Sequence, residues 1–150
     1  MSCTNPNLWY GKNHTHHSQL GDADFVDSFE NGSLQPKLFT HEAHLRLAWI
    51  YLQNDDEQDA VEKTCSGIKH FDALHGSGEK FHATITIAAV KVVYHFIKKS
   101  KSTTFSDFME EFPLLKGAFK ELLEQHYSSN SLKNQQAKTE YIEPDLLPFD

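Results

Sequence analysis

The sequence predicts an all-α protein: a single bundle of about five to six helices that ends in an extended C-terminal segment. Apolar residues recur at about every third or fourth position through most of the chain, which is the period of an amphipathic helix. Residues that start or stop helices stand at the ends of these runs, such as Thr40 and Asn31-Gly32. The apolar run at 79–99 is rich in β-branched residues, but it is too long for a strand.

Each expected helix has its own apolar stripe. Phe25, Val26 and Phe29 mark the first, at 22–31. The helix at 41–53 is apolar on nearly every face, which is typical of a central, buried helix. The remaining helices are expected at 56–74, 79–99, 104–111 and 113–126, with a short helical turn near 135–140.

We expect a polar tail at 1–20 and one helical domain at 21–150. The tail holds His14, His16 and His17, which could bind a metal, but its composition favours a loose segment. It lacks the apolar core of a signal peptide, so a cytoplasmic protein is expected. At the other end, large apolar residues beside two prolines suggest that the C-terminal segment lies back on the body: Leu146, Leu147 and Phe149.

Charge and composition limit the partners. The chain has 150 residues, a formal net charge of -7 and a single arginine, Arg46. An acidic chain with one arginine is a poor candidate for binding nucleic acid or an anionic membrane. No apolar run reaches the roughly 18 residues that span a bilayer. Cys3 lies in the polar tail and Cys65 on a helix, so neither a disulfide nor a zinc motif is expected from cysteine alone.

Short loops join the helices expected at 41–53, 56–74 and 79–99, and short connections favour antiparallel neighbours. The first turns of the first and third of these helices then lie at the same end of the bundle. The loop between the second and third helices lies there as well. Five histidines are thereby expected at one end: His41, His44, His70, His75 and His82.

One interpretation of this cluster is a divalent metal site, for example for zinc, held by His41, His44 and His82. Three protein ligands with one open position are usual for catalytic zinc. Three carboxylates could serve as a fourth ligand or as a hydrogen-bond partner of a ligating histidine: Glu42, Asp72 and Glu79.

Two other interpretations stay open. The same histidines could be acid–base or hydrogen-bonding groups in a small-molecule pocket, assisted by Thr86 and Tyr51. Helix N-termini keep imidazoles neutral, and their free backbone amides favour an anionic ligand. Alternatively, the histidines are structural and hydrogen-bond to loops or to the C-terminal segment.

Two further side chains are expected to be structural. Arg46 shares a helix face with Glu42, which favours a surface ion pair between them. Cys65 lies on the apolar face of its helix, which favours a core thiol over a nucleophile.

Several motifs, taken in order, resemble those of a family of small bacterial all-helical proteins. The resemblance covers about 37–148 and implies a shared fold and a shared site, without implying a reaction. The residues that carry it are Phe39-Thr40-His41, His44-Leu45, Leu47-Ala48-Trp49, Gly67-Ile68-Lys69, Phe71, Phe81-His82, Thr84-Ile85-Thr86, Tyr127-Ser128, Ala137, Tyr141, Pro144-Asp145-Leu146 and Pro148.

The sequence therefore predicts a helical protein with a histidine-lined pocket for a small molecule or a divalent metal. Whether that pocket is catalytic stays open, and a non-catalytic structural or interaction module is the alternative. The apolar face of 22–31 or the C-terminal segment offers a surface for a homodimer.

Overall fold

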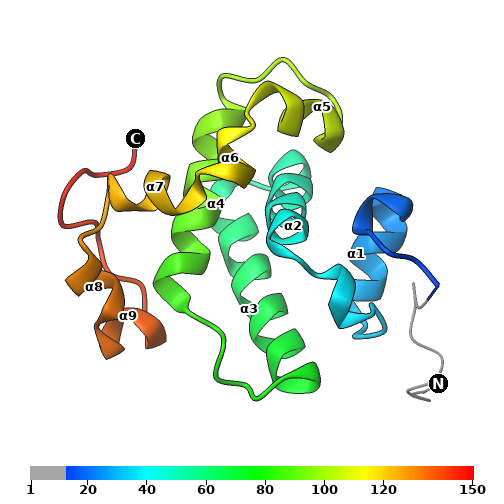
Figure 1. Ribbon diagram of the computed structural model, residues 1–150, viewed down its shortest axis with the longest axis horizontal. Coiled ribbons are helices and arrows are strands. Elements are labelled where there is room, and N and C mark those ends of the chain that lie inside the picture. Colours follow the sequence, from blue (N-terminus) through cyan, green and yellow to red (C-terminus); the bar gives the residue numbers. More distant parts are fainter. Residues whose placement is uncertain (1–12) are drawn as a thin grey trace.

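The structure is a computed structural model that describes residues 13–150, and it confirms the all-α class (Figure 1). Over this range it contains nine α-helices, of which five have seven or more residues. The predictions for Cys3 and for the start of the N-terminal tail fall outside the described residues. In the part of the chain that the structure describes, no helix is long and apolar enough to cross a membrane.

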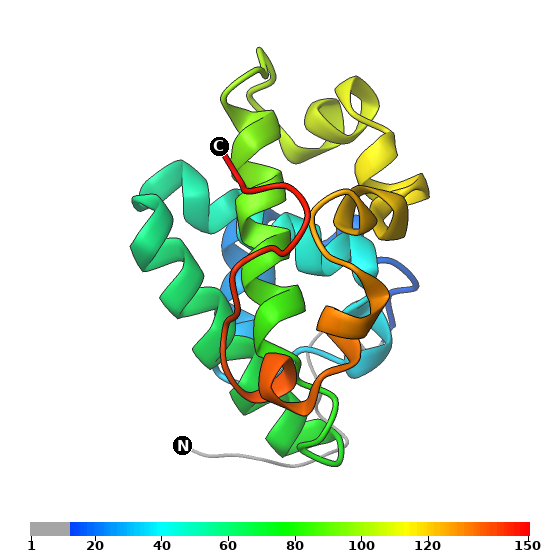
Figure 2. The ribbon, with the colours of Figure 1, turned by 90° about the vertical axis from the view of Figure 1, so that its left-hand side faces the viewer.

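Three helices form the centre of the fold, and each packs on the other two: α2 (His41–Asn54), α3 (Glu57–His75) and α4 (Ala83–Ile97). Their arrangement is visible in Figures 1 and 2. As predicted, α2 is buried on nearly every side, from Leu45 to Tyr51. Helices α2 and α3 begin where the sequence predicts, because both have strong N-caps. The side chains of Thr40 and Asp56 each accept a backbone N–H of the first turn.

The first helix, α1 (Asp22–Glu30), packs against α3. Phe29 is fully buried, and its ring stacks on that of Phe71 with centroids 5.4 Å apart. Gly67 makes this approach possible, because a Cβ there would lie 2.7 Å from the Phe29 ring. A short 3₁₀ turn at Pro36–Leu38 then leads into α2.

The helix predicted from 79 begins later, at Ala83. The Asp72 carboxylate accepts the backbone N–H groups of Lys80 and Phe81, at 2.8 and 3.1 Å, which keeps this stretch out of the helix. His82 then acts as the N-cap, because its Nδ1 accepts the N–H of Ile85 at 3.1 Å. His82 is therefore the cap of α4 and does not lie in its first turn.

Five shorter helices run from the C-terminal end of α4 back toward its N-terminal end (Figure 1). The helix predicted at 113–126 is broken at Ala118, whose φ of -135° and ψ of 33° are not helical. The break lets Leu115 enter the main core while Leu123 joins a second cluster with Tyr127. The helices of this region are α5 (Phe105–Glu111), α6 (Leu114–Gly117), α7 (Phe119–Glu124), α8 (Ser129–Lys133) and α9 (Gln135–Thr139), of which α8 was not predicted.

After α9 the C-terminal segment runs back along α4, as Figure 2 shows. Thr84 holds it there: its hydroxyl donates to the Glu140 carbonyl at 3.0 Å and accepts the N–H of Ile142 at 3.2 Å. Phe149 packs on the body, but Leu146 and Leu147 stay exposed. The expected packing of three apolar residues is thus seen for one of them.

Tyr127 fixes the same segment from the other side. It is fully buried, and its hydroxyl donates to the Ile142 carbonyl at 2.8 Å. We expect Tyr127→Phe to lower the free energy of unfolding by about 1 kcal/mol, because a partly buried carbonyl loses its donor. Urea denaturation measures this. Tyr94→Phe is the matched control, since the Tyr94 ring contacts Lys98 and should tolerate the change.

Candidate functional site

The first part of the site is the carboxylate of Glu42, in the first turn of α2. The positive end of a helix dipole stabilises a carboxylate at this position. The Glu42 side chain is only 16% exposed, so it is held against the body of the protein. It faces a segment that precedes it by more than twenty residues in the sequence.

That segment is a single 3₁₀ turn at His17–Gln19 with His16 as its N-cap. Nδ1 of His16 accepts the Ser18 N–H at 3.1 Å, and the Gln19 side chain accepts the His16 N–H at 2.9 Å. These reciprocal bonds form a capping box, which fixes the orientation of the His16 imidazole. His17 is 2% exposed, so the expectation that this part of the chain is loose was wrong.

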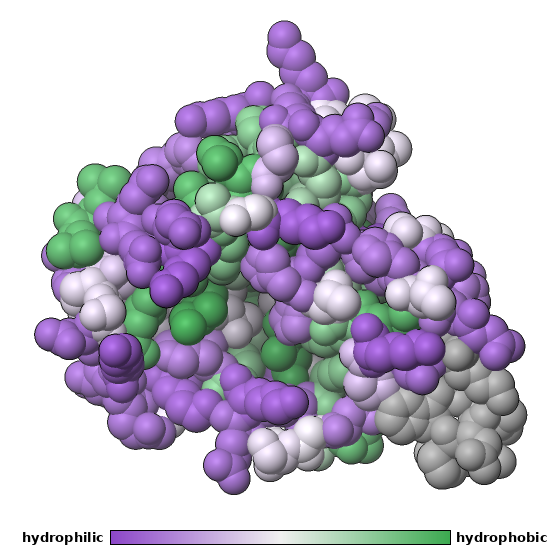
Figure 3. Space-filling model, viewed as in Figure 1, coloured by the Kyte–Doolittle hydropathy of each residue, from purple (hydrophilic) through white to green (hydrophobic). Residues whose placement is uncertain are grey.

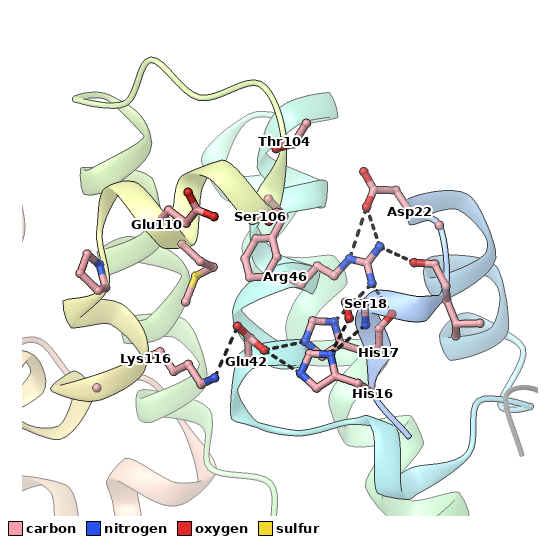
Figure 4. Close-up of a pocket in the computed structure, with 16 residues that line it drawn as sticks. His16, His17, Ser18, Asp22, Glu42, Arg46, Thr104, Ser106, Glu110 and Lys116 are labelled. Carbon is pink, nitrogen blue, oxygen red and sulfur yellow. Dashed lines mark hydrogen bonds and ion pairs between the residues drawn. The ribbon is translucent and has the colours of Figure 1, made fainter. Parts of the chain in front are cut away.

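The two imidazoles converge on one oxygen atom (Figure 4). Nε2 of His16 lies 3.0 Å from Oε1 of Glu42, and Nε2 of His17 lies 3.1 Å from the same atom. The side-chain ligand atoms of the three residues all lie within 4.8 Å of one another. We call these residues the His16–His17–Glu42 group. Lys116 approaches from α6, with Nζ 3.9 Å from the other Glu42 oxygen.

Arg46, beside the group, holds this segment to α2. Its guanidinium donates to the carbonyls of His17 and Leu20, both at 2.7 Å, and to Oδ1 of Asp22 at 2.9 Å. The expected surface pair between Arg46 and Glu42 is therefore a wrong prediction: Arg46 is buried and pairs with Asp22. The helical spacing was compatible with the predicted pair, but a segment from far away in the sequence occupies the space beside Arg46.

The hydrogen bonds also fix the protons on the imidazoles. Nη1 of Arg46 lies 3.3 Å from Nδ1 of His17, and a guanidinium can only donate. Nδ1 of His17 is thus an acceptor, and its proton lies on Nε2, facing Glu42. The bond from the Ser18 N–H gives His16 the same tautomer. Without a metal, both imidazoles donate from Nε2 to one carboxylate oxygen.

The pKa shifts agree with this arrangement. Burial lowers the pKa of His17 below its usual 6.5, against the opposing effect of the bond to Glu42. Burial raises the pKa of Glu42, but the bond from His17 and the charge of Lys116 outweigh it, so the net pKa of Glu42 is lowered. Glu42 is therefore an ionised carboxylate beside a neutral His17 imidazole at neutral pH.

A pH dependence of stability follows from the His17 shift. The unfolded chain binds a proton on His17 more readily than the folded chain, so the free energy of unfolding should fall as the pH drops below about 6.5. His44, whose pKa is also lowered by burial, adds to the same fall. Urea denaturation at pH values above and below this point, with a chelator present, measures it.

His17→Gln is the control for that measurement, because glutamine donates a hydrogen bond but does not titrate. We expect the fall in stability with pH to be smaller in this variant than in the natural chain, with the remainder due to His44. Equal falls in both proteins would mean that His17 is not a neutral, buried imidazole.

A cavity of about 910 Å³ adjoins the group. One wall is the N-terminal segment and α2, and the opposite wall comes from α5 and the turn that follows it. Figure 4 shows side chains from both walls around the opening. Polar residues that line it beyond the group include Thr104, Ser106 and Glu110. A ligand bound at the group would therefore have room on its open side.

The histidines singled out by the sequence are each held by a main-chain carbonyl. Nε2 of His41 donates to Leu115 at 3.2 Å, and Nδ1 of His44 donates to Thr40 at 2.7 Å. Nε2 of His82 donates to Leu132 at 3.1 Å while its Nδ1 caps α4, so both of its ring nitrogens are used. The proposed metal site at His41, His44 and His82 stays a prediction.

The structure brings some of these predicted residues together. His44, His82, Thr86 and Asp72 line one cavity of about 420 Å³. Tyr51 does not line it, because its side chain is buried toward α1 and its hydroxyl donates to Glu30 at 2.5 Å. Asp72 accepts two loop N–H groups, so its carboxylate supports the start of α4.

The sequence reasoning missed the His16–His17–Glu42 group as a unit. It noted each member, but assigned the two histidines to a loose tail and Glu42 to a different cluster. A weak signal was present: Leu20 and Phe25 follow the histidines closely, and an apolar anchor implies that the adjoining residues are docked.

Comparison with protein-family models, with curated proteins and with solved structures finds no match to this chain. The function must therefore be argued from the geometry of the site.

Proposed function

We propose that the protein binds one divalent first-row metal ion, such as zinc, at the His16–His17–Glu42 group. The observation that carries the proposal is the convergence of two imidazole Nε2 atoms and one carboxylate oxygen within 4.8 Å, beside an open cavity. Two imidazoles and one carboxylate are a common donor set for zinc and for iron(II).

The spacing of the donor atoms fits such an ion. Zinc binds imidazole nitrogen and carboxylate oxygen at about 2.0–2.2 Å, so two ligand atoms of a tetrahedral ion lie about 3.3 Å apart. The Nε2–Oε1 distances of His16 and His17 to Glu42, 3.0 and 3.1 Å, are close to this value. The third separation, between the two imidazole nitrogens, is at most 4.8 Å, so a modest adjustment of the side chains would bring all three atoms around the ion.

Proton movement sets the cost of binding. When Nε2 of each histidine binds a metal, the proton of the neutral ring lies on Nδ1. At His16 a proton on Nδ1 displaces the bond from the Ser18 backbone N–H, but the Ser18 hydroxyl oxygen, 2.8 Å from Nδ1, can accept it. At His17 the proton on Nδ1 would face the guanidinium of Arg46. Arg46 would then give up its contact with Nδ1 and keep its hydrogen bond to the His17 carbonyl. Asp22 offsets the positive charge of Arg46 nearby.

The remaining coordination positions face the cavity. Three protein ligands leave a tetrahedral ion one position for water or for part of a bound molecule. Lys116 lies at the rim, is mostly exposed and can move away from Glu42 when the ion arrives. The arrangement therefore supports an accessible metal and not a closed structural one.

The test is a calorimetric titration of the full chain with Zn²⁺, with His16→Gln as the variant. His16 is 46% exposed, so its loss should not unfold the protein. We expect the natural chain to bind one ion and the variant to bind it at least about 100-fold more weakly, because a direct ligand should matter more than an outer partner, whose loss costs about 10–100-fold.

His14→Gln is the matched control, because His14 lies in the same segment but outside the group. It should bind zinc as the natural chain does. If His14→Gln and His16→Gln weaken binding equally, or if the natural chain binds no ion, the proposal is wrong.

A further inference from the structure

A second cavity lies among the three central helices, on the other side of α2 from the metal group. It has a volume of about 300 Å³ and is lined by α2, α3, α4 and Phe119 of α7. Glu42 and His44 are two positions apart, which places them about 200° apart around α2. We call this space the inner cavity. Its lining includes Ala48 and Ala89, whose small side chains leave the space between α2 and α4 unfilled.

A buried hydroxyl in the inner cavity has no partner. Thr64 of α3 lines the cavity and is 2% exposed, and its Oγ1 makes no hydrogen bond within the described part of the chain. A threonine inside a helix often bonds to the carbonyl four residues earlier, but this one does not. Buried polar groups without a partner are rare, because leaving one unpaired costs stability. A ligand with a polar group at this point would remove that cost.

The lining restricts the charge of such a ligand. Among the described residues that line the inner cavity there is no Asp, Glu, Lys or Arg. Burial lowers the pKa of His44, so this imidazole is neutral at neutral pH. Because Nδ1 of His44 donates to the Thr40 carbonyl, its Nε2 carries no proton and can only accept. The remaining histidine of the lining, His41, is engaged through Nε2 with the Leu115 carbonyl. A charged ligand would therefore find no carboxylate, lysine or arginine opposite it, whereas a neutral group that donates a hydrogen bond would find acceptors.

The inner cavity has a route to the surface. It shares His44, Ile68, Ile85 and Thr86 with the cavity of about 420 Å³ described above, so the two spaces adjoin. Figure 3 shows apolar side chains at the bottom of a hollow on this face of the molecule, among polar ones. For comparison, a cavity of about 150 Å³ in a protein core holds benzene.

We propose that the inner cavity binds a neutral, mostly apolar molecule about the size of a substituted aromatic ring, whose single hydroxyl or amide group hydrogen-bonds to Thr64. This site is separate from the metal group and does not depend on it. The apolar lining supplies the binding energy, and Thr64 selects the polar group.

The test compares three probes that share one ring: p-cresol, toluene and 4-methylbenzoate. Each is titrated into the full ¹⁵N-labelled chain, and the backbone amide shifts near Thr64 report the dissociation constant. We expect p-cresol to bind at least about fivefold more tightly than toluene, which corresponds to one net hydrogen bond. The carboxylate of 4-methylbenzoate should prevent saturable binding.

Two variants make the test specific. Thr64→Val keeps the shape but removes the hydroxyl, so p-cresol should lose its advantage over toluene, while the unfolding midpoint should not fall. Ala89→Leu fills the cavity and should abolish binding of both probes, while zinc binding at Glu42 stays unchanged. The proposal is overturned if p-cresol does not bind near Thr64, if 4-methylbenzoate binds as well, or if Thr64→Val retains the preference for p-cresol.

Discussion

Replacing Glu42 with glutamine is expected to weaken zinc binding by about 100-fold or more, the largest functional effect that the site predicts. Glutamine has nearly the same shape as glutamate, but it lacks the negative charge of the carboxylate that both imidazoles contact and that would bind the metal. A neutral amide oxygen is a poorer zinc ligand than a carboxylate. Isothermal titration calorimetry of the natural chain and the variant measures the difference.

Glu110→Gln is the matched control for this prediction. Glu110 also lines the cavity, but it is not among the three residues whose ligand atoms converge. If Glu42 is a ligand, Glu110→Gln should bind zinc nearly as the natural chain does. An unchanged affinity in Glu42→Gln would contradict the proposed ligand set even if the protein binds zinc.

Replacing Arg46 with alanine is expected to have the largest effect on stability, a loss of about 3–5 kcal/mol. Arg46 is 6% exposed and donates to two main-chain carbonyls and one carboxylate, which all lose their partner together. Leaving a buried carbonyl without its donor costs about 1–3 kcal/mol, so the two carbonyls account for most of this loss. Asp22 adds little, because its side chain is 55% exposed. Chemical denaturation of the metal-free protein measures the loss.

Lys63→Ala tests whether burial is the cause. Lys63 also forms an ion pair at 2.9 Å, with Asp55, but it is mostly exposed. Ion pairs of that kind contribute little, so the variant should unfold close to the natural chain. Similar losses in Lys63→Ala and Arg46→Ala would mean that the buried carbonyl contacts of Arg46 are not what stabilises the docked N-terminal segment.

The sequence predicted the central helices well because their signals are local. The caps of α2 and α3 are each a single side chain that bonds within its own first turn, and such motifs are visible in sequence. The start of α4 was misplaced because Asp72, from another helix, holds the N–H groups of Lys80 and Phe81. The break at Ala118 likewise depends on tertiary packing, because Leu115 packs in the main hydrophobic core and Leu123 in a second apolar cluster.

The candidate site was harder to predict because its parts are distant in the chain. His16 and Glu42 stand 26 positions apart, and what joins them is the docking of the N-terminal segment on Arg46. Nothing in the spacing of these residues reveals that contact. By contrast, His44 and Thr86 were predicted to lie together from the antiparallel order of the helices, and they line the same two cavities.

The most direct test of the metal proposal is a long-range ¹H–¹⁵N correlation spectrum of the histidine side chains, recorded before and after zinc is added. Before zinc, His16 and His17 should show a proton on Nε2, because their Nδ1 atoms accept from Ser18 and Arg46. With zinc, we expect Nε2 of both histidines to bind the metal and the proton to lie on Nδ1, while His41, His44 and His82 stay unchanged. Spectra in which His16 and His17 do not respond, or in which His41, His44 and His82 respond instead, would contradict the proposal.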